Sequence, residues 1–304
     1  MSRPKVSVSI ITYNQRDYIG EAIESALAQQ TDFPVKLNIG DDFSDDGTRE
    51  ILRDYAARYP EQITLSLQPK RPEGIAGRVN NITNLKSCEG EYIALLDGDD
   101  FWTDPHKLQG QVDFLDSNPA YTGAAHDCMI LNARTGRALE PTIGGRSPLG
   151  LPDHPIDISQ GELLDRETFQ TSSLIFRRRN LAFPQWFERV YAADFAIFLM
   201  VAGHGPIRFV PQVQSVYRHH GGSIMAQTSQ PDWARRFVAD WPIFFEQFPA
   251  TATFRQRMKL LRARRIAAIA QRQWLTAASA SIQLLIQDPG AVRRQFDQWS
   301  KDRA

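Results

Sequence analysis

The sequence has few cysteines, no long apolar segment and no net charge. Its 304 residues include two cysteines, Cys88 and Cys128, which are too few for a disulfide framework and favour a reducing compartment. The first residues lack an apolar stretch followed by a small-residue cleavage site, so we expect no signal peptide. The longest apolar run, Phe195 to Gly203, is much shorter than the ~20 residues that span a bilayer. These absences predict a soluble, cytoplasmic protein.

Positive and negative charges balance over the whole chain but not along it. The chain carries 35 Lys+Arg and 35 Asp+Glu. Residues 235–304 hold 13 Lys+Arg and 5 Asp+Glu, so their net charge of +8 is matched by −8 over the first 234 residues. No internal repeat or low-complexity tract is present. This asymmetry indicates a basic C-terminal region attached to an acidic core.

The first hundred residues alternate between short β-branched runs and segments with helical spacing. The expected strands are Val6–Thr12, Val35–Gly40, Ile63–Leu67 and Tyr92–Leu96, and the expected helices are Gln15–Gln30, Arg49–Tyr59 and Val79–Ser87. Strands that alternate with helices predict an α/β fold with a mostly parallel central sheet flanked by helices.

The rest of the chain is less regular. We expect helices at Lys107–Asp116 and Asp194–Val201, strands at Gly123–Leu131, Thr171–Arg177 and Ile207–Val210, and a mobile Pro/Gly-rich loop at Pro141–Pro155. From Trp233 the pattern is helical, with expected breaks at Pro242, Pro249 and Pro289. The predicted domains are therefore 1–232 and a C-terminal helical region, 233–304.

Two acidic clusters directly follow predicted strands: Asp41 with Asp42, and the Asp97–Asp100 segment DGDD. Ligands of an open parallel sheet bind outside the carboxyl ends of its strands, so both clusters should lie at one edge. Carboxylates at such spacing repel one another unless a cation compensates, and a hard divalent ion that also binds a substrate diphosphate would do so. Each cluster alone could also be a surface turn, because Asp, Ser and Gly are common turn residues.

Three segments at their spacings, VSVSIITYN, IGDDFSDDGT and GEYIALLDGDDFW, together resemble glycosyltransferase family 2. The resemblance extends from Val6 to about Ser223. It implies the GT-A fold, with a nucleotide-sugar-binding half over about 1–105 and an acceptor half over 106–232. It also implies an Asp-x-Asp motif that binds a divalent metal, Mn²⁺ or Mg²⁺, and inversion at the anomeric carbon of the sugar.

The resemblance assigns roles to residues of these motifs. The implied donor-binding residues are Thr12, Tyr13, Asn14, Asp41, Asp42, Asn80, Asp97, Arg218 and His220, and the implied metal ligands are Asp99, Asp97 and His220. Carboxylates suit this task because they accept hydrogen bonds from a base N–H and from ribose hydroxyls. Tyr13 could instead pack in the core, and Asn81 and Asn84 lie close to the Asn80 match.

An inverting transferase needs a general base for the acceptor hydroxyl. The resemblance places it at Asp194, where a carboxylate before an apolar helix could also be an ordinary N-cap. Arg218 would supply fixed positive charge to phosphate oxygens, and His220 would contact phosphate or metal. The alternative for the segment around them is an exposed basic loop. Thr171–Ser173 matches a segment near the acceptor, although these hydroxyls could simply cap local structure.

Other residue groups have simpler interpretations. His126 and Cys128 lack a second ligand pair, so we expect strand packing rather than a zinc site. The aromatic residues between Trp233 and Phe248 are expected to pack in a core. Phe254 to Ala270 is predicted to be a basic amphipathic helix, which could lie on an anionic membrane surface or be a solvated face beside a packed stripe.

The sequence therefore predicts an inverting, metal-dependent glycosyltransferase that uses a nucleotide sugar, with UDP preferred over dTDP and GDP, in bacterial glycan or polysaccharide assembly. The expected acceptors are a glycan, a lipid-linked molecule or a protein. No nucleic-acid partner is expected, and the basic C-terminal helices could hold the enzyme at the inner face of the membrane. The alternatives are a metal-dependent nucleotidyltransferase, which also uses GDD-type carboxylates, and a catalytically inactive nucleotide-sugar-binding protein.

Overall fold

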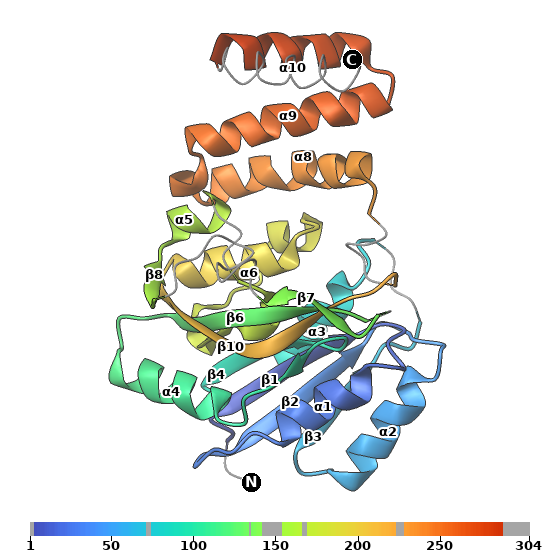
Figure 1. The fold of residues 1–304 in the computed structure, drawn as a ribbon, viewed down its shortest axis with the longest axis vertical. Coiled ribbons are helices and arrows are strands. Elements are labelled where there is room, and N and C mark those ends of the chain that lie inside the picture. The colour runs from blue at the N-terminus through green and yellow to red at the C-terminus, as the bar shows by residue number, and fades with distance from the viewer. Residues whose placement is uncertain are drawn as a thin grey trace. The chain divides into compact units, whose positions relative to one another are not determined.

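The computed structural model describes residues 3–70, 74–133, 135–141, 154–165, 169–222 and 228–287. The chain divides into two units (Figure 1). The first consists of Met1–Arg189 and Ala193–Ser223, and the second of Val190–Ala192 and Ile224–Ala304. Two predictions fall on undescribed residues: most of the loop Pro141–Pro155, and the helix break at Pro289, lie outside the described ranges.

The first unit is built around one sheet in the order β3-β2-β1-β4-β9-β6-β10-β5, with β7 paired to β6 and β8 to β10. In chain order its strands are β1 (Val6–Thr12), β2 (Val35–Asp41), β3 (Ile63–Leu67), β4 (Tyr92–Asp97), β5 (Phe101–Trp102), β6 (Gly123–Asn132), β7 (Arg137–Pro141), β8 (Ile156–Ile158), β9 (Ile175–Arg177) and β10 (Ile207–His219). Strands β1 to β4 are parallel, and so are β6 and β10. The predicted α/β class with a mostly parallel sheet is confirmed.

Helices connect the parallel strands of this sheet. They are α1 (Ile19–Leu27), α2 (Thr48–Arg58), α3 (Arg78–Ser87), α4 (Lys107–Ser117), α5 (Gln160–Asp165) and α6 (Ala193–Ala202). Helix α1 shows why they form, because Ile19, Ala22, Ile23 and Ala26 recur at helical spacing and all are buried. The chain adds β2 and then β3 on one side of β1 but β4 on the other. This reversal between β1 and β4 is a topological switch point, where sheets of this kind bind ligands.

Four predicted elements differ from the structure. Helix α1 begins at Ile19 rather than Gln15, because the N–H groups of residues 14–16 bond to side chains of the next loop. The predicted strand Thr171–Arg177 is a 3₁₀ turn (Thr171–Ser173) followed by β9, since Ser172 and Ser173 use their hydroxyls in other hydrogen bonds. The strand expected at Ile207–Val210 continues to His219, so Tyr217 and Arg218 lie in a strand and not in a loop. Pro242 does not break its helix.

The second unit contains the helices α8 (Gln230–Gln247), α9 (Phe254–Ala270) and α10 (Trp274–Gln287), which follow one another as a stack in Figure 1. Pro242 is accommodated inside α8, where Trp241 stacks on Phe237 at a centroid distance of 3.6 Å and Phe244 is fully buried. Such packing offsets the ~3 kcal/mol that an internal proline costs a helix. The predicted helical C-terminal region is confirmed. None of the described helices is long and apolar enough to cross a membrane.

The short segment Val190–Ala192 belongs to the second unit because α8 binds it. The buried carboxylate of Asp240 accepts the N–H of Tyr191 at 2.9 Å and the N–H of Ala192 at 2.8 Å. Ala193, the next residue, begins α6. This carboxylate therefore fixes the backbone of Tyr191 and Ala192.

Candidate active site

The carboxyl ends of β2, β1 and β4 lie side by side in the sheet. Thr12 at the end of β1 is in register with Asp41 at the end of β2, and Ile11 is in register with Asp97 at the end of β4. Parallel pairing alone produces this alignment. The structure thus brings the DDFSDDGT and DGDD motifs to one edge, as the sequence predicts, and the TYN motif lies beside them at the switch point.

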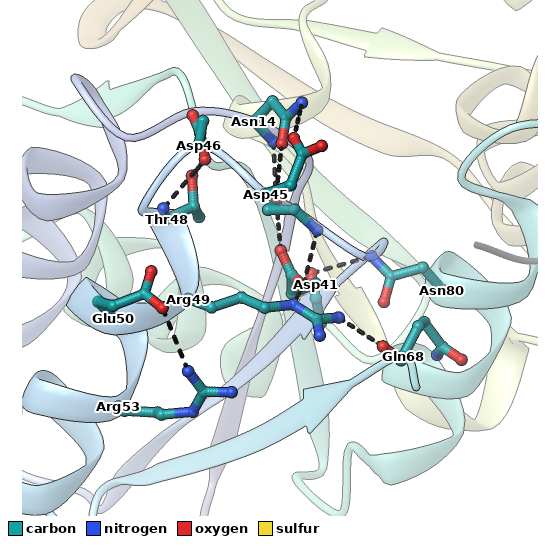
Figure 2. Close-up of polar contacts among 12 residues, drawn as sticks. Asn14, Asp41, Asp45, Asp46, Thr48, Arg49, Glu50, Arg53, Gln68 and Asn80 are labelled. Carbon is teal, nitrogen blue, oxygen red and sulfur yellow. Dashed lines mark hydrogen bonds and ion pairs between the residues drawn. The ribbon is translucent and has the colours of Figure 1, made fainter. Parts of the chain in front are cut away.

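A ladder of hydrogen bonds fastens the loop after β1 to the loop after β2 (Figure 2). Asn14 donates from Nδ2 to Asp45 at 3.0 Å and accepts the Asp45 N–H at 3.0 Å, and its own N–H bonds to Ser44 Oγ. The N–H of Gln15 bonds to Thr48 Oγ1 at 3.0 Å. Asn14 has φ = 51°, a conformation that Asn tolerates better than most residues. Asn14 therefore joins the two loops, whereas Tyr13 beside it is 38% exposed and is not a core aromatic.

Asp41 is engaged inside the protein. Its fully buried carboxylate accepts hydrogen bonds from the N–H and hydroxyl of Ser44 and forms an ion pair with Arg49, which also donates to the carbonyl of Gln68 (Figure 2). Asp42, also buried, accepts the N–H of Gly77 at 3.0 Å. Asp41 thereby determines the path of the loop after β2.

We predict that Asp41→Asn lowers the free energy of unfolding by about 3 kcal/mol, because loss of one partner of a buried ion pair leaves the other charge uncompensated. Thermal or urea unfolding measures this change. The matched control is Glu50→Gln, since Glu50 pairs with Arg53 at 3.5 Å on the exposed side of α2 and should contribute less than about 1 kcal/mol. Equal stability of the two variants would contradict the role assigned to Asp41.

Two polar groups beneath the strand ends are buried without a hydrogen-bond partner. Asn80 donates from Nδ2 to the carbonyl of Gly40 at 2.9 Å, but among the described residues its Oδ1 has no partner, and neither has Thr12 Oγ1. Asn84, one turn later, instead uses Nδ2 to bind Ser9 and the carbonyls of Ile10 and Asn38. Asn84 therefore ties α3 to β1 and β2, and Asn80 lies against the end of β2.

The carboxylates of the DGDD segment destabilise one another's charged forms. Burial, and then the charges of Asp100, Asp99 and Asp194, raise the pKa of Asp97 well above its ordinary value. Burial and the charge of Asp99 raise the pKa of Asp100 to about 7, although its oxygens accept the Ser172 hydroxyl at 2.6 Å and the Arg218 N–H at 3.0 Å. Asp100 is thus held by Ser172 and β10, while Asp97 and Asp99 are half-buried.

The end of β10 brings two cationic or ionisable side chains to Asp99. His220 Nε2 lies 2.9 Å from Asp99 Oδ2, and its ring lies 4.8 Å from that of Tyr18. The guanidinium of Arg218 donates to the Asp99 carbonyl at 2.8 Å and forms an ion pair with Glu21. These contacts explain why Arg218 is buried although it is charged.

The donor atoms around Asp99 fit a divalent cation. Within the described ranges no three His, Cys, Asp or Glu side chains surround a common point. Mg²⁺ in proteins is bound through one or two carboxylates and completes its shell with substrate phosphates and water, at about 2.1 Å. Two adjacent ligands of such an octahedron lie about 3 Å apart, close to the 2.9 Å between Asp99 Oδ2 and His220 Nε2. A cation here would also relieve the repulsion among the carboxylates.

Asp194 lies in the first turn of α6, close enough to Asp97 for their charges to interact. It is half-buried, and its Oδ1 accepts the N–H of Phe195 at 2.9 Å. Burial raises the pKa of Asp194, whereas the N–H groups of the turn and the charge of Arg78 lower it by less. A carboxylate with a raised pKa near the metal-binding candidates is suited to accept a proton near neutral pH.

Sequence reasoning missed several residues of this site. Tyr18, directly before α1, contacts His220, and Glu21 on α1 contacts Arg218. The charge of Arg78 on α3 lowers the pKa of Asp194. Their positions in the sequence carry no motif, so only the packing of α1 and α3 reveals them. Ser172 lies in a segment that the sequence related to the acceptor, but here it binds Asp100. His126 and Cys128 are buried in β6. Neither Cys128 nor Cys88 forms a disulfide.

Comparisons with known proteins agree with this geometry. The model of Glycosyl transferase family 2 matches residues 7–190. An uncharacterized protein of Mycobacterium tuberculosis is 36% identical over 220 residues, which are 72% of this chain and 60% of the relative, so the chain spans about three fifths of the length of that relative. The UDP-Glc:alpha-D-GlcNAc-diphosphoundecaprenol beta-1,3-glucosyltransferase WfaP of Escherichia coli is 28% identical over 230 residues, 73% of this chain and 80% of its own.

A solved structure shows the same fold. The mannosyltransferase PcManGT from Pyrobaculum calidifontis, in complex with GDP-Man and Mn²⁺, superposes with a TM-score of 0.56 at 19% identity, covering 99% of this chain and 84% of that one. At this level of identity the likeness concerns the fold alone. The predicted GT-A fold is confirmed.

Proposed function

Because the chain belongs to glycosyl transferase family 2, we propose that it transfers a sugar from a nucleotide-sugar donor to an acceptor hydroxyl in glycan assembly. The observation that carries this proposal is the convergence of Asp97, Asp99, His220 and Asp194 at the switch point of the sheet. The TYN and DDFSDDGT loops beside them would bind the nucleoside, with Thr12, Tyr13, Asp42 and Asn80 nearest to it. Asn14 and Asp41 would shape these loops rather than contact the donor through their side chains.

The proposed reaction is a single displacement with inversion. Asp194 removes the proton of the acceptor hydroxyl as its oxygen bonds to the anomeric carbon, and the bond from that carbon to the diphosphate oxygen breaks. Arg218, held by Glu21 and the Asp99 carbonyl, places positive charge near the departing diphosphate. A divalent cation bound by Asp99, with Asp97 and His220, would supply Lewis-acid stabilisation of that leaving group.

We propose UDP as the nucleotide, since the glucosyltransferase WfaP uses UDP-Glc, while PcManGT binds GDP-Man. A thermal-shift screen of UDP-, dTDP- and GDP-sugars with and without Mn²⁺ tests this choice. A bound ligand stabilises the folded state by RT ln(1 + [L]/Kd), so a donor at a hundredfold excess over its Kd adds about 2.7 kcal/mol. No shift with any of these sugars would refute the proposed function.

The products distinguish this function from its rivals. Glycosyl transfer releases a nucleoside diphosphate, nucleotidyl transfer releases pyrophosphate, and an inactive binding protein releases neither. The raised pKa of the half-buried Asp194, whose charge interacts with that of Asp97, favours the enzyme, because carboxylates with perturbed pKa values are concentrated at catalytic sites.

We also propose that the second unit contacts an anionic membrane, through α10 rather than through the predicted apolar face of α9. Met258 and Leu261 of α9 pack with Leu284 in a core, so these two side chains of the predicted face are not available to lipid. Helix α10 instead exposes apolar side chains: Trp274 (65% exposed), Leu275 (89%), Ile282 (56%) and Ile286 (73%). Residues 228–287 carry nine Lys+Arg and three Asp+Glu, a charge that anionic lipid attracts.

We predict that Trp274→Ser/Leu275→Ser reduces co-sedimentation with phosphatidylglycerol vesicles at least fivefold, because each exposed side chain would bury apolar area in the interface. The control Gln271→Ser/Gln273→Ser alters exposed polar residues of the preceding turn and should bind like the wild type. Equal binding of the wild type to anionic and neutral vesicles would argue for a helix stack without membrane contact.

A further inference from the structure

A concave surface lies at the edge of the first unit's sheet opposite to the candidate active site. A cavity of about 630 Å³ opens at the amino ends of β1 and β4 and beside the end of β9, with Phe33, Pro34 and Pro4 forming its apolar wall. Strand β1 has seven residues, so this cavity is about 20 Å from the end that carries Thr12. Its volume is within the range of ligand-binding pockets. It is therefore separate from the candidate active site.

The lining of this cavity is strongly basic. Arg3, Lys5, Arg177, Arg178 and Arg179 face it, against one acidic residue, Glu91. Residues 1–223 as a whole carry 22 Lys+Arg and 29 Asp+Glu, a net charge of −7. Cations gathered around one cavity repel one another, so an anion bound among them would relieve this repulsion.

The five cations are not equally available to a ligand. Arg177 is buried and donates to Tyr92 Oη, to the Tyr121 carbonyl and to the Leu115 carbonyl. Lys5 forms ion pairs with Glu91 and Asp116. By contrast, no hydrogen bond or ion pair reaches the guanidinium of Arg178 or Arg179 from any part of the chain that the structure describes. These two side chains carry the uncompensated charge of the cavity.

The backbone holds these two arginines in place. Arg178 and Arg179 lie in a 3₁₀ turn (Arg178–Asn180) that directly follows β9, and the Arg178 N–H bonds to the Glu91 carbonyl at 2.9 Å. The three bonds of Arg177 anchor the preceding residue. A rigid backbone reduces the entropy lost on binding, and planar guanidinium groups match phosphate oxygens in pairs.

From this geometry we infer a second, anion-binding site at the amino edge of the sheet, in which Arg178 and Arg179, with Arg3, bind a phosphate group. The phosphate would belong either to a soluble anion such as pyrophosphate or to the headgroup of an anionic phospholipid. The inference does not depend on glycosyl transfer.

Calorimetric titration with inorganic pyrophosphate, in EDTA and at constant ionic strength, tests the site. We expect Arg178→Gln/Arg179→Gln to bind pyrophosphate at least tenfold more weakly than the wild type. The matched control is Arg53→Gln/Arg58→Gln, which removes two exposed arginines from α2 and should bind like the wild type. The active-site variant Asp99→Asn should also retain binding. Baseline melting temperatures establish that all variants are folded.

A second titration, with monomeric dihexanoylphosphatidylglycerol, distinguishes the two sources of the phosphate. Binding of this lipid that is lost in Arg178→Gln/Arg179→Gln, without binding of pyrophosphate, identifies a headgroup site, and the reverse identifies a site for a soluble anion. The inference is overturned if the wild type binds neither probe, or if the cavity variant and the α2 control lose affinity equally.

Discussion

Asp194→Asn is expected to lower kcat by a hundredfold or more while the affinity for the nucleotide-sugar donor changes little. Loss of a general base commonly costs a factor of 10² to 10⁴. Asparagine keeps the shape of the side chain, and its amide oxygen can still accept the Phe195 N–H, so the first turn of α6 should remain intact. The measurements are steady-state kinetics and donor titration. The control Glu188→Gln neutralises an exposed carboxylate six residues earlier and should keep normal kcat.

The pH profile of the same pair of enzymes provides an independent check. Burial raises the pKa of Asp194, and only the deprotonated carboxylate can accept a proton. Wild-type kcat should therefore fall as the pH drops through this raised pKa, above the ordinary range of an aspartate, and the remaining activity of Asp194→Asn should not show this acidic limb. If Asp194→Asn retains near-normal kcat, Asp194 serves only the first turn of α6 and the base is another group.

Asp99→Asn is expected to abolish the gain in donor affinity that Mn²⁺ confers on the wild type. The substitution removes the negative charge without changing shape, and it replaces one carboxylate oxygen by an amide NH2, which cannot bind a cation. Donor titration with Mn²⁺ and with EDTA measures the gain in each protein. The melting temperature should not fall, because Asp99 is half-buried among other carboxylates and its removal relieves repulsion.

Asp113→Asn is the control for Asp99→Asn, since Asp113 is an exposed carboxylate on α4 with a single side-chain hydrogen bond to Gln109. Its donor affinity should respond to Mn²⁺ like that of the wild type. Equal donor affinity of Asp99→Asn and the wild type, both in Mn²⁺, would show that the cation is held elsewhere or is not used.

The sequence alone determined the N-terminal half of the fold and the edge at which the site lies. The strands β1 to β4 and helices α2 and α3 fall within one or two residues of the predicted ranges. Their hydrophobic periodicity is local, so it can be read without knowing the partners of each strand. Since parallel strands end at the same edge, the convergence of Asp41 and Asp97 also followed from sequence.

Only the tertiary structure decided what each of these polar residues contacts. Asp41 and Asp42 are adjacent residues of the same type, but it is Asp41 that forms an ion pair with Arg49. Asp100 binds Ser172 and β10, and Arg218 reaches Glu21, 197 positions away in the chain. The contacts of Asp100 and Arg218 depend on the insertion of β9 between β4 and β6 and on the pairing of β10 with β6. The pairing of β9 with β4 also places Arg178 and Arg179 at the amino edge of the sheet, because β9 runs antiparallel to β4. Local patterns in the sequence determine the strands and helices. The partners of Asp100 and Arg218 are determined by long-range pairing of strands, whose energy comes from packing between distant segments.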